Sequence, residues 1–225
     1  MNDEASLARA KVLAPLLPAR IFSAEIFGDP PLPALHPAEQ AALGRAGSKR
    51  LRDFSGGRAC ARRALLEFGV EATPVLIGED RAPLWPRGVV GSITHCQDYC
   101  AAAVGSESDF RAIGIDAEPH DMLPSGVLEL IATPRERNWL QTEAGSSLCW
   151  DRILFSAKES AFKAGARFWR ETLPFDQIEI SFDPIAGAFE AGPSSIDGLP
   201  RLKGRFQVAS GLIATTVVVS ASSAG

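Results

Sequence analysis

Residues 113–118 read Ile-Gly-Ile-Asp-Ala-Glu. In this stretch, the apolar pattern of a buried strand is followed directly by two acidic side chains. The apolar residues before and within it predict a strand over 110–116 that ends in two acids. Asp116 and Glu118 are two residues apart, so their side chains point to the same face of an extended chain. Two neighbouring carboxylates repel each other, and burial raises the free-energy cost of keeping both of them charged. A divalent cation such as Mg²⁺ relieves the repulsion, whereas a solvated strand end is the simpler alternative for an isolated Asp-x-Glu.

The composition is typical of a globular protein. The chain has 225 residues, of which 46% are hydrophobic and 22% charged, enough for one large domain or two small ones. No apolar run approaches the roughly 18 residues of a membrane span, and the acidic start at Met1 lacks the features of a signal peptide. We therefore expect a cytoplasmic protein without membrane contact. Four cysteines without a Cys-x-x-Cys pair predict reduced thiols rather than a disulfide framework or a zinc site.

The charge is unevenly distributed. A net charge of −4 argues against general nucleic-acid binding. Between positions 45 and 63, however, seven basic residues face a single acid, Asp53: Arg45, Lys49, Arg50, Arg52, Arg58, Arg62 and Arg63. Such a segment indicates a small polyanionic ligand or an acidic partner, and the alternative is a solvated helix face.

Helices are expected in both halves of the chain. Six prolines within 1–37 argue against long helices there, apart from a short one near 7–13. Pro37 fits the first turn of the next helix, and basic and apolar residues continue at helical spacing to position 54. The pair Gly56-Gly57 is expected to interrupt this helix before a second one that ends at Gly69. Further helices are expected from the Thr133 cap and over 148–168.

The remaining elements are strands. They are expected at 75–77, 89–94, 99–104, 110–116, 178–182, 188–190, 206–209 and 212–220, with a hairpin turn at 96–98 and the last strand central in its sheet. The segments 191–204 and 220–225 are expected to be mobile loops. Each half has helices first and strands afterwards, which predicts an α+β protein of two halves, 1–108 and 109–225, related by a structural duplication without a sequence repeat.

A second charged cluster lies within the helix expected over 148–168. Glu159 and Lys163 are four residues apart and share one face, while small apolar residues pack inward. Most such pairs are surface ion pairs. Here, a third carboxylate together with Lys158 and Lys163 also provides what a magnesium–pyrophosphate site needs, namely acids for the metal and cations for the phosphate oxygens.

Three segments in this order carry a family resemblance. Residues 91–95 read Gly-Ser-Ile-Thr-His, followed by 113–118 and by the helix segment 150–163. The combination resembles the 4′-phosphopantetheinyl transferases of the surfactin and enterobactin synthase type over roughly 49–166. The sequence Gly-Ile-Asp-Ala-Glu-Pro-His at 114–120 is most similar to the actinobacterial branch.

The resemblance implies an activity and its residues. Such enzymes transfer the 4′-phosphopantetheine arm of coenzyme A to a serine of an acyl or peptidyl carrier protein and release 3′,5′-ADP. Asp116, Glu118 and Glu159 match the metal ligands, for Mg²⁺ or else Mn²⁺. Asp116, Glu159 and Lys163 match the catalytic residues, with Glu159 as candidate base. The matching coenzyme A contacts are Arg50, Arg58, Arg81, Thr94, His95, Lys158 and Lys163.

The resemblance also implies an architecture and leaves alternatives open. It implies two similar α+β halves with the site between them, acting as a monomer on carrier proteins of fatty-acid, polyketide, nonribosomal-peptide or siderophore biosynthesis. His95 has the alternative of a hydrogen-bonded core histidine. For the whole chain, the alternatives are a non-catalytic module that binds carrier proteins and a magnesium-dependent hydrolase of nucleotide pyrophosphates.

Overall fold

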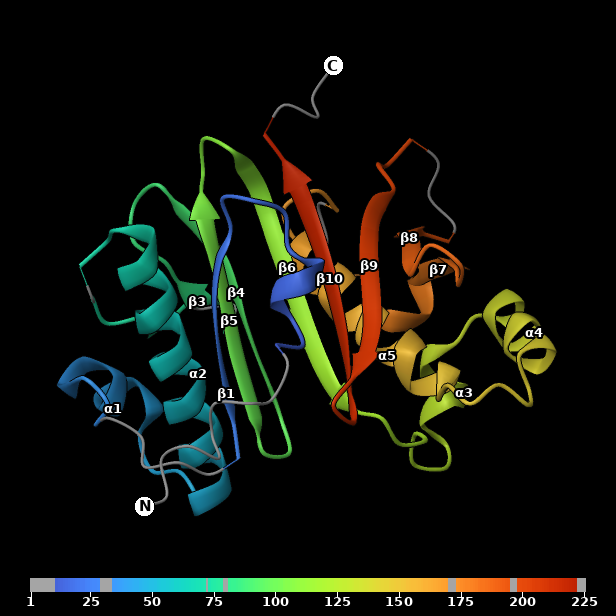
Figure 1. Ribbon diagram of the computed structural model, residues 1–225, viewed down its shortest axis with the longest axis horizontal. Helices are drawn as coiled ribbons and strands as arrows, with labels where there is room; N and C mark the ends of the chain where they lie inside the picture. Colours follow the sequence, from blue (N-terminus) through green and yellow to red (C-terminus); the bar gives the residue numbers. More distant parts are fainter. Residues whose placement is uncertain are drawn as a thin grey trace.

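Strands β6 (Phe110–Pro119) and β10 (Leu212–Ser220) lie antiparallel at the centre of the molecule (Figure 1). The structure is a computed structural model, and it describes residues 11–28, 34–71, 73–78, 81–169, 173–194 and 198–221. β10 is interior because its other edge pairs with β9 (Leu202–Ala209), as its β-branched sequence predicts. β8 (Ala188–Pro193) and β7 (Ile178–Asp183) complete the five-stranded sheet, ordered β6-β10-β9-β8-β7.

A second, three-stranded sheet precedes the first along the chain. Its order is β1-β5-β4, with bounds Phe22–Phe27, Tyr99–Ser106 and Val89–Cys96. β4 and β5 form the expected hairpin, whose turn places Asp98 at φ 55°. A small pair, β2 (Leu76–Ile77) and β3 (Pro83–Leu84), lies beside this sheet. Helices and sheets together confirm the α+β class.

Side-chain hydroxyls join the two sheets where β4 runs alongside β6. The Ser92 hydroxyl accepts a hydrogen bond from the Ile115 amide at 3.2 Å, and the Thr94 hydroxyl accepts one from the Ala117 amide at 3.2 Å. These bonds satisfy buried amides of β6 that have no strand partner on that side. The strand that carries both acids is therefore held in register with β4.

The long helix of the first half is continuous, which corrects the predicted break at Gly56-Gly57. Helix α2 (Ser48–Phe68) packs on β1, β4 and β5 and ends at Gly69, which has φ 90°. A Cβ on Gly57 would lie 2.8 Å from the Ile93 side chain. The glycine therefore serves close packing of α2 on β4 rather than a turn. Before it comes α1 (Pro37–Leu43), which begins at Pro37 as expected. The predicted continuation of this helix to position 54 is wrong, because α1 ends at Leu43 before Gly44, and α2 begins only at Ser48.

Helix α5 (Trp150–Gly165) packs against β6 and β10. A Cβ on Gly114 would lie 2.0 Å from the Ser160 carbonyl oxygen, so only glycine permits this approach. The close contact places the acids of β6 beside the charged face of α5. The other helical elements of this half are α3 (Val127–Ile131), α4 (Pro134–Thr142) and the 3₁₀ turn η2 (Phe175–Gln177). The capping box of Thr133 and Glu136 at the start of α4 confirms the predicted cap.

Other sequence predictions need correction. β1 was not expected, because the prolines around it suggested an irregular segment. β6 continues to Pro119, so Asp116 and Glu118 lie within the strand and not after it. The predicted loop 191–204 is shortened by β8 and β9. Most of the helix expected at 7–13 and of the tail beyond 220 lies outside the described residues. Within them, η1 (Ala14–Leu16) is the first element. Within the described ranges, no helix combines the length and apolarity that crossing a bilayer requires.

Candidate active site

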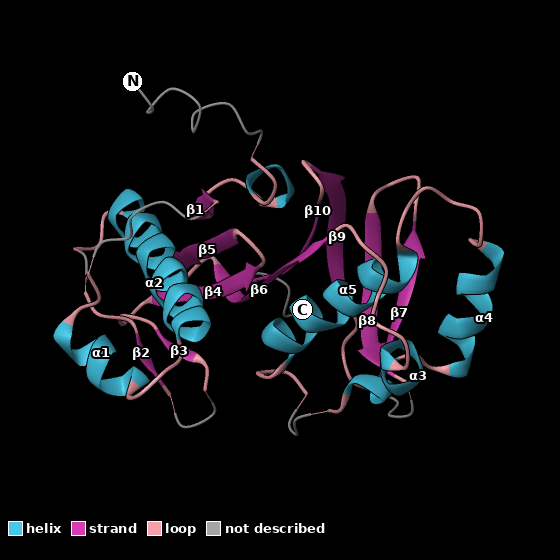
Figure 2. Cartoon of the chain, turned by 90° about the horizontal axis from the view of Figure 1, so that it is seen from below, coloured by secondary structure: helices cyan, strands magenta, loops and turns pink. Residues whose placement is uncertain are grey.

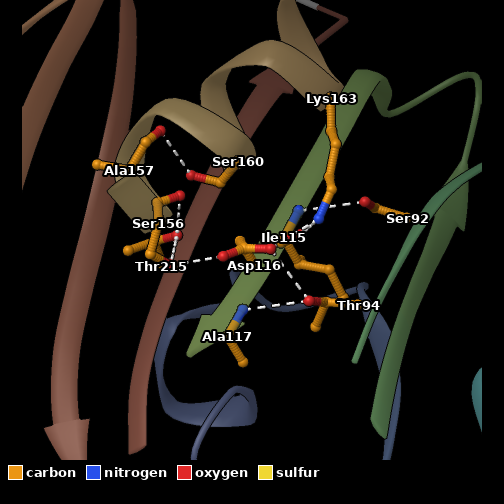
Figure 3. Close-up of polar contacts among 10 residues, drawn as sticks. All are labelled: Ser92, Thr94, Ile115, Asp116, Ala117, Ser156, Ala157, Ser160, Lys163 and Thr215. Carbon is orange, nitrogen blue, oxygen red and sulfur yellow. Dashed lines mark hydrogen bonds and ion pairs between the residues drawn. The ribbon is translucent and has the colours of Figure 1, made fainter. Parts of the chain in front are cut away.

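Asp116 is the centre of the site and is only 4% exposed. One carboxylate oxygen accepts hydrogen bonds from Lys163 Nζ at 2.8 Å and Thr94 Oγ1 at 3.1 Å. The other accepts from Ser156 Oγ at 2.8 Å (Figure 3). Lys163 also donates to the Ile115 carbonyl at 3.0 Å. A buried carboxylate with donors on both oxygens and a lysine partner is fixed in place.

Glu118 has its own cationic partner. Arg152 of α5 donates to the Glu118 carboxylate at 2.9 Å and to the carbonyls of Asp121 and Met122 at 3.1 and 2.8 Å. Burial raises the pKa of Glu118, the charge of Asp116 raises it further, and Arg152 opposes both effects. The influence of Asp116 shows that the two carboxylates lie close enough to interact.

Glu159 is half-buried, and no hydrogen bond or ion pair holds its carboxylate within the parts of the chain that the structure describes. Burial raises the pKa of Glu159, Lys163 lowers it, and Asp116 raises it. Lys163 thus acts on both Asp116 and Glu159, so one lysine serves two neighbouring carboxyl groups. This excess of acid fits an additional cation.

The predicted metal ligands do not form a ready cluster. Among the described residues, no group of three acid, histidine or cysteine side chains is placed to hold a metal ion. Arg152 holds Glu118 and Lys163 holds Asp116 in this arrangement. The prediction that all three carboxylates converge on one cation is therefore not shown by the geometry.

A pocket of about 1360 Å³ opens beside this site, lined by residues of α2, β4, β6 and α5. Figure 2 shows the two long helices on either side of β4 and β6. The aromatic side chains Phe54, Trp85 and Phe162 contribute apolar wall, while Glu159 and Lys163 contribute the charged wall nearest Asp116. The pocket therefore combines apolar surface with cationic groups, as a large anionic cofactor requires.

Four of the predicted coenzyme A contacts line this pocket beside Lys163: Arg50, Arg58, Arg81 and His95. The side chain of His95 is 52% exposed, and its Nδ1 lies 3.9 Å from the Asp53 carboxylate. This exposure excludes the alternative of a core histidine. Arg58 is partly committed to structure, because it donates to the Val75 carbonyl at 2.7 Å and stacks on Phe54. Burial lowers the pKa of Arg58 to about 10.

Two predicted contacts lie elsewhere. Lys158 is fully buried on the opposite side of α5, where its Nζ binds the Glu136 carboxylate at 2.8 Å and the carbonyls of Ile131 and Ile178 at 2.6 Å each. It cannot reach coenzyme A in this pocket, so that assignment is corrected. Thr94 is 2% exposed and does not line the pocket. Its hydroxyl donates a hydrogen bond to the Asp116 carboxylate.

The sequence interpretation missed several site residues. Ser156 lies three residues before Glu159, so helical spacing could have placed it on the same face. Arg152, the partner of Glu118, lies 34 positions away along the chain, and local sequence gives no signal for such a pair. Three further arginines of the pocket wall, Arg87, Arg111 and Arg167, are scattered along the chain and were also missed.

Comparison with known proteins decides the family. Residues 38–105 match the 4′-phosphopantetheinyl transferase N-terminal domain, and residues 112–198 match the 4′-phosphopantetheinyl transferase superfamily. The chain belongs to the 4′-phosphopantetheinyl transferase superfamily. The 4′-phosphopantetheinyl transferase Npt of Nocardia iowensis is 43% identical over 90% of this chain and 97% of its own length. The 4′-phosphopantetheinyl transferase Svp of Streptomyces mobaraensis is also 43% identical, over 93% of this chain and 90% of its own length.

Membership in this superfamily fixes the activity. The chain is a transferase that moves the phosphopantetheine arm of coenzyme A onto a carrier-protein serine. A further relative, enterobactin synthase component D of Escherichia coli, is 40% identical but covers only 55% of this chain. The two alternatives, a non-catalytic binding module and a pyrophosphate hydrolase, are not supported by these relatives.

Proposed function

We propose that this phosphopantetheinyl transferase is magnesium-dependent and that Asp116, Glu159 and Lys163 carry out the transfer. The observation that carries the proposal is the carboxyl group of Glu159 beside the buried Asp116, because no hydrogen bond or ion pair within the described residues holds it. Carboxylate oxygens are the ligands that Mg²⁺ prefers, so Asp116 and Glu159 would hold the ion, with Glu118 as third ligand. When bound, the ion would neutralise the charge on the diphosphate of coenzyme A.

The protein's own residues orient the reacting groups. Lys163 can donate hydrogen bonds to the oxygens of the diphosphate, and Asp116 holds its ammonium group in place at 2.8 Å. Glu159 can accept the proton of the carrier serine, directly or through a water molecule. Phosphoryl transfer depends mainly on positioning and on charge neutralisation, and this site provides groups for both.

We infer that the 3′-phosphate of coenzyme A lies at the end of the pocket formed by Arg50, Arg81 and His95. Arg50 lies on α2, Arg81 precedes β3, and His95 lies on β4, so three separate segments bring positive or hydrogen-bonding groups to the wall of this pocket. Arg58 joins α2 to the segment before β3, because its side chain donates hydrogen bonds to the carbonyls of Val75 and Leu76.

His95→Ala is expected to raise the KM for coenzyme A about ten- to a hundredfold. This factor corresponds to the binding free energy of one hydrogen bond to a charged group. Dephospho-coenzyme A lacks the 3′-phosphate, so its use should change little. Steady-state kinetics with both substrates measures the difference, with Gln97→Ala in the adjacent turn as matched control. An equal loss with both substrates would contradict the assignment.

We further infer that the two halves, 1–108 and 109–225, are related by an approximate twofold and enclose the site in a monomer. In support, each half packs one long helix, α2 or α5, against an antiparallel sheet. Sedimentation of the purified chain tests the monomer. We also propose a cytoplasmic location, supported by four free cysteines, and titration of four thiols without added reductant checks this.

A mass-shift assay tests the function. The chain is incubated with coenzyme A, Mg²⁺ and a panel of apo carrier proteins from fatty-acid, polyketide and nonribosomal peptide synthesis. We expect at least one carrier to gain the mass of one phosphopantetheine, and the gain to disappear with chelator. Hydrolysis of coenzyme A without any carrier would instead indicate a pyrophosphate hydrolase. Transfer that persists in chelator would refute the magnesium dependence alone.

A further inference from the structure

The pocket has a second cationic end that coenzyme A itself does not require. Arg87, Arg111 and Arg167 all line the pocket wall. The first end, at His95, and the second, near the start of β4, are separated by the length of that strand. From Val89 to His95 this amounts to about 20 Å at about 3.3 Å per residue. Coenzyme A carries one phosphate group besides its diphosphate, so a single cationic end suffices for it.

A β-bulge aims Arg111 into the pocket. Along β10, Val219 pairs with Ala112 and the next residue, Ser220, pairs with Phe110. Arg111 is therefore an extra residue without a partner, and such bulges redirect a side chain. Its neighbours Phe110 and Ala112 are buried, whereas Arg111 is exposed and belongs to the pocket wall.

Hydrogen bonds place Arg167 and the segment that carries Arg87 close to Arg111. Arg167 donates to the Arg111 carbonyl at 3.0 Å and lies 3.4 Å from the Glu107 carboxylate. The Glu107 amide in turn donates to the Gly88 carbonyl at 2.9 Å, next to Arg87. Three segments thus converge, and Glu107 offsets one of three positive charges, so this end of the pocket is net cationic.

The reach of the phosphopantetheine arm matches the position of this end. Arg111 lies five residues before Asp116 along β6, or about 16 Å. From phosphorus to sulfur, the arm has as many bonds as about four extended residues, roughly 15 Å. With the 3′-phosphate at the His95 end and the diphosphate beside Lys163, an arm that extends along β6 away from His95 brings the thiol close to the three arginines.

We propose that the Arg87, Arg111 and Arg167 end binds a carboxylate on the acyl group of a coenzyme A thioester. This inference rests on the proposed function and deepens it. It predicts that short dicarboxylic acyl-coenzyme A thioesters are used better than neutral ones, because arginine pairs with carboxylate through two parallel hydrogen bonds.

The chemistry of the transfer is unchanged by the acyl group. The oxygen of the carrier serine forms a bond to the phosphorus of the arm, and the phosphoanhydride bond to 3′,5′-ADP breaks. The serine proton passes to Glu159 or to water, and 3′,5′-ADP leaves with the bonding electron pair. The thioester is not touched, so the carrier receives the arm already acylated.

Competition between two matched thioesters tests the proposal. Succinyl- and butyryl-coenzyme A have acyl chains of equal length that end in a carboxylate or a methyl group. With both present at equal concentration, mass spectrometry of one carrier gives the ratio of their kcat/KM values. We expect about a three- to tenfold preference for the succinyl arm, falling with salt because the arginines are exposed.

Charge-removing variants assign the preference to these residues. Arg111→Gln and Arg167→Gln should each bring the ratio towards one, and Arg87→Gln, on a separate segment, repeats the test if either fails to fold. Arg135→Gln removes an exposed arginine outside this pocket and should leave the ratio unchanged.

Three outcomes would overturn the proposal. The first is a ratio near one in the unmodified protein, and the second is a preference that survives all three variants. The third is that Arg111→Gln abolishes the discrimination between coenzyme A and dephospho-coenzyme A, which would place the 3′-phosphate at this end. Absence of transfer from any of these substrates, coenzyme A included, would instead refute the proposed function itself.

Discussion

Asp116→Asn is expected to lower kcat/KM for carrier modification by about a hundredfold or more. The amide keeps the shape of the carboxylate but removes its charge from a buried position. Lys163 would lose the anion that holds its ammonium group at 2.8 Å, and a bound cation would lose a ligand. Groups that stabilise charge in a transition state contribute about 10²–10³ each, so loss of the residue that fixes them should cost at least that much.

The mass-shift assay under initial-rate conditions measures this effect. Asp98→Asn is the matched control, because Asp98 is exposed in the β4–β5 turn and its φ of 55° suits asparagine equally well. Raising Mg²⁺ should restore part of the activity if weakened metal binding causes the loss. Activity of Asp116→Asn near that of the unmodified protein at ordinary Mg²⁺ would remove Asp116 from the site.

The parts of the site that depend on local spacing could be predicted from the sequence. The two-residue spacing of Asp116 and Glu118 fixes their shared face in any extended strand, and the four-residue spacing of Glu159 and Lys163 does so in any helix. What each carboxylate binds is a tertiary property. The bond from Lys163 to Asp116 spans 47 positions, and it exists because Gly114 lets α5 approach β6 closely.

The errors in the fold have physical causes of the same kind. Strand β1 has a recognisable alternation, with Ala24 and Ile26 buried, but the surrounding prolines obscured it. Gly57 looked like a helix break because glycine lowers helix propensity by about 1 kcal/mol. Packing against Ile93 outweighs that cost, and this contact is not visible in the sequence.

The burial of Lys158 was missed because its charge suggested an exposed side chain, although its helical position indicated a buried one. Leu154 lies four residues before it and Ala161 three residues after it; both are buried, and helical spacing places Lys158 on their face. The charge nevertheless suggested a solvent-facing phosphate contact. The buried Glu136 and two backbone carbonyls provide a polar environment within the core that a sequence pattern cannot show.

Lys158→Met is therefore expected to lower stability rather than coenzyme A binding. Methionine fills similar volume but leaves Glu136, 3% exposed, without its cationic partner. Breaking one partner of a buried ion pair costs about 3–5 kcal/mol. For a chain of this length, that corresponds to a drop in melting temperature of roughly 10 °C. Thermal denaturation measures it, with Lys203→Met on exposed β9 sequence as control.

Kinetics below the melting transition then separates the two roles of Lys158. If the lysine only anchors α5, the folded variant should keep the KM for coenzyme A within about twofold. Glu136→Gln combined with Lys158→Met removes both buried charges and should regain part of the lost stability, because no ion remains uncompensated. A variant with an unchanged melting temperature and a strongly raised KM for coenzyme A would show that Lys158 contacts the substrate after all, through a rearrangement of α5 that exposes its ammonium group.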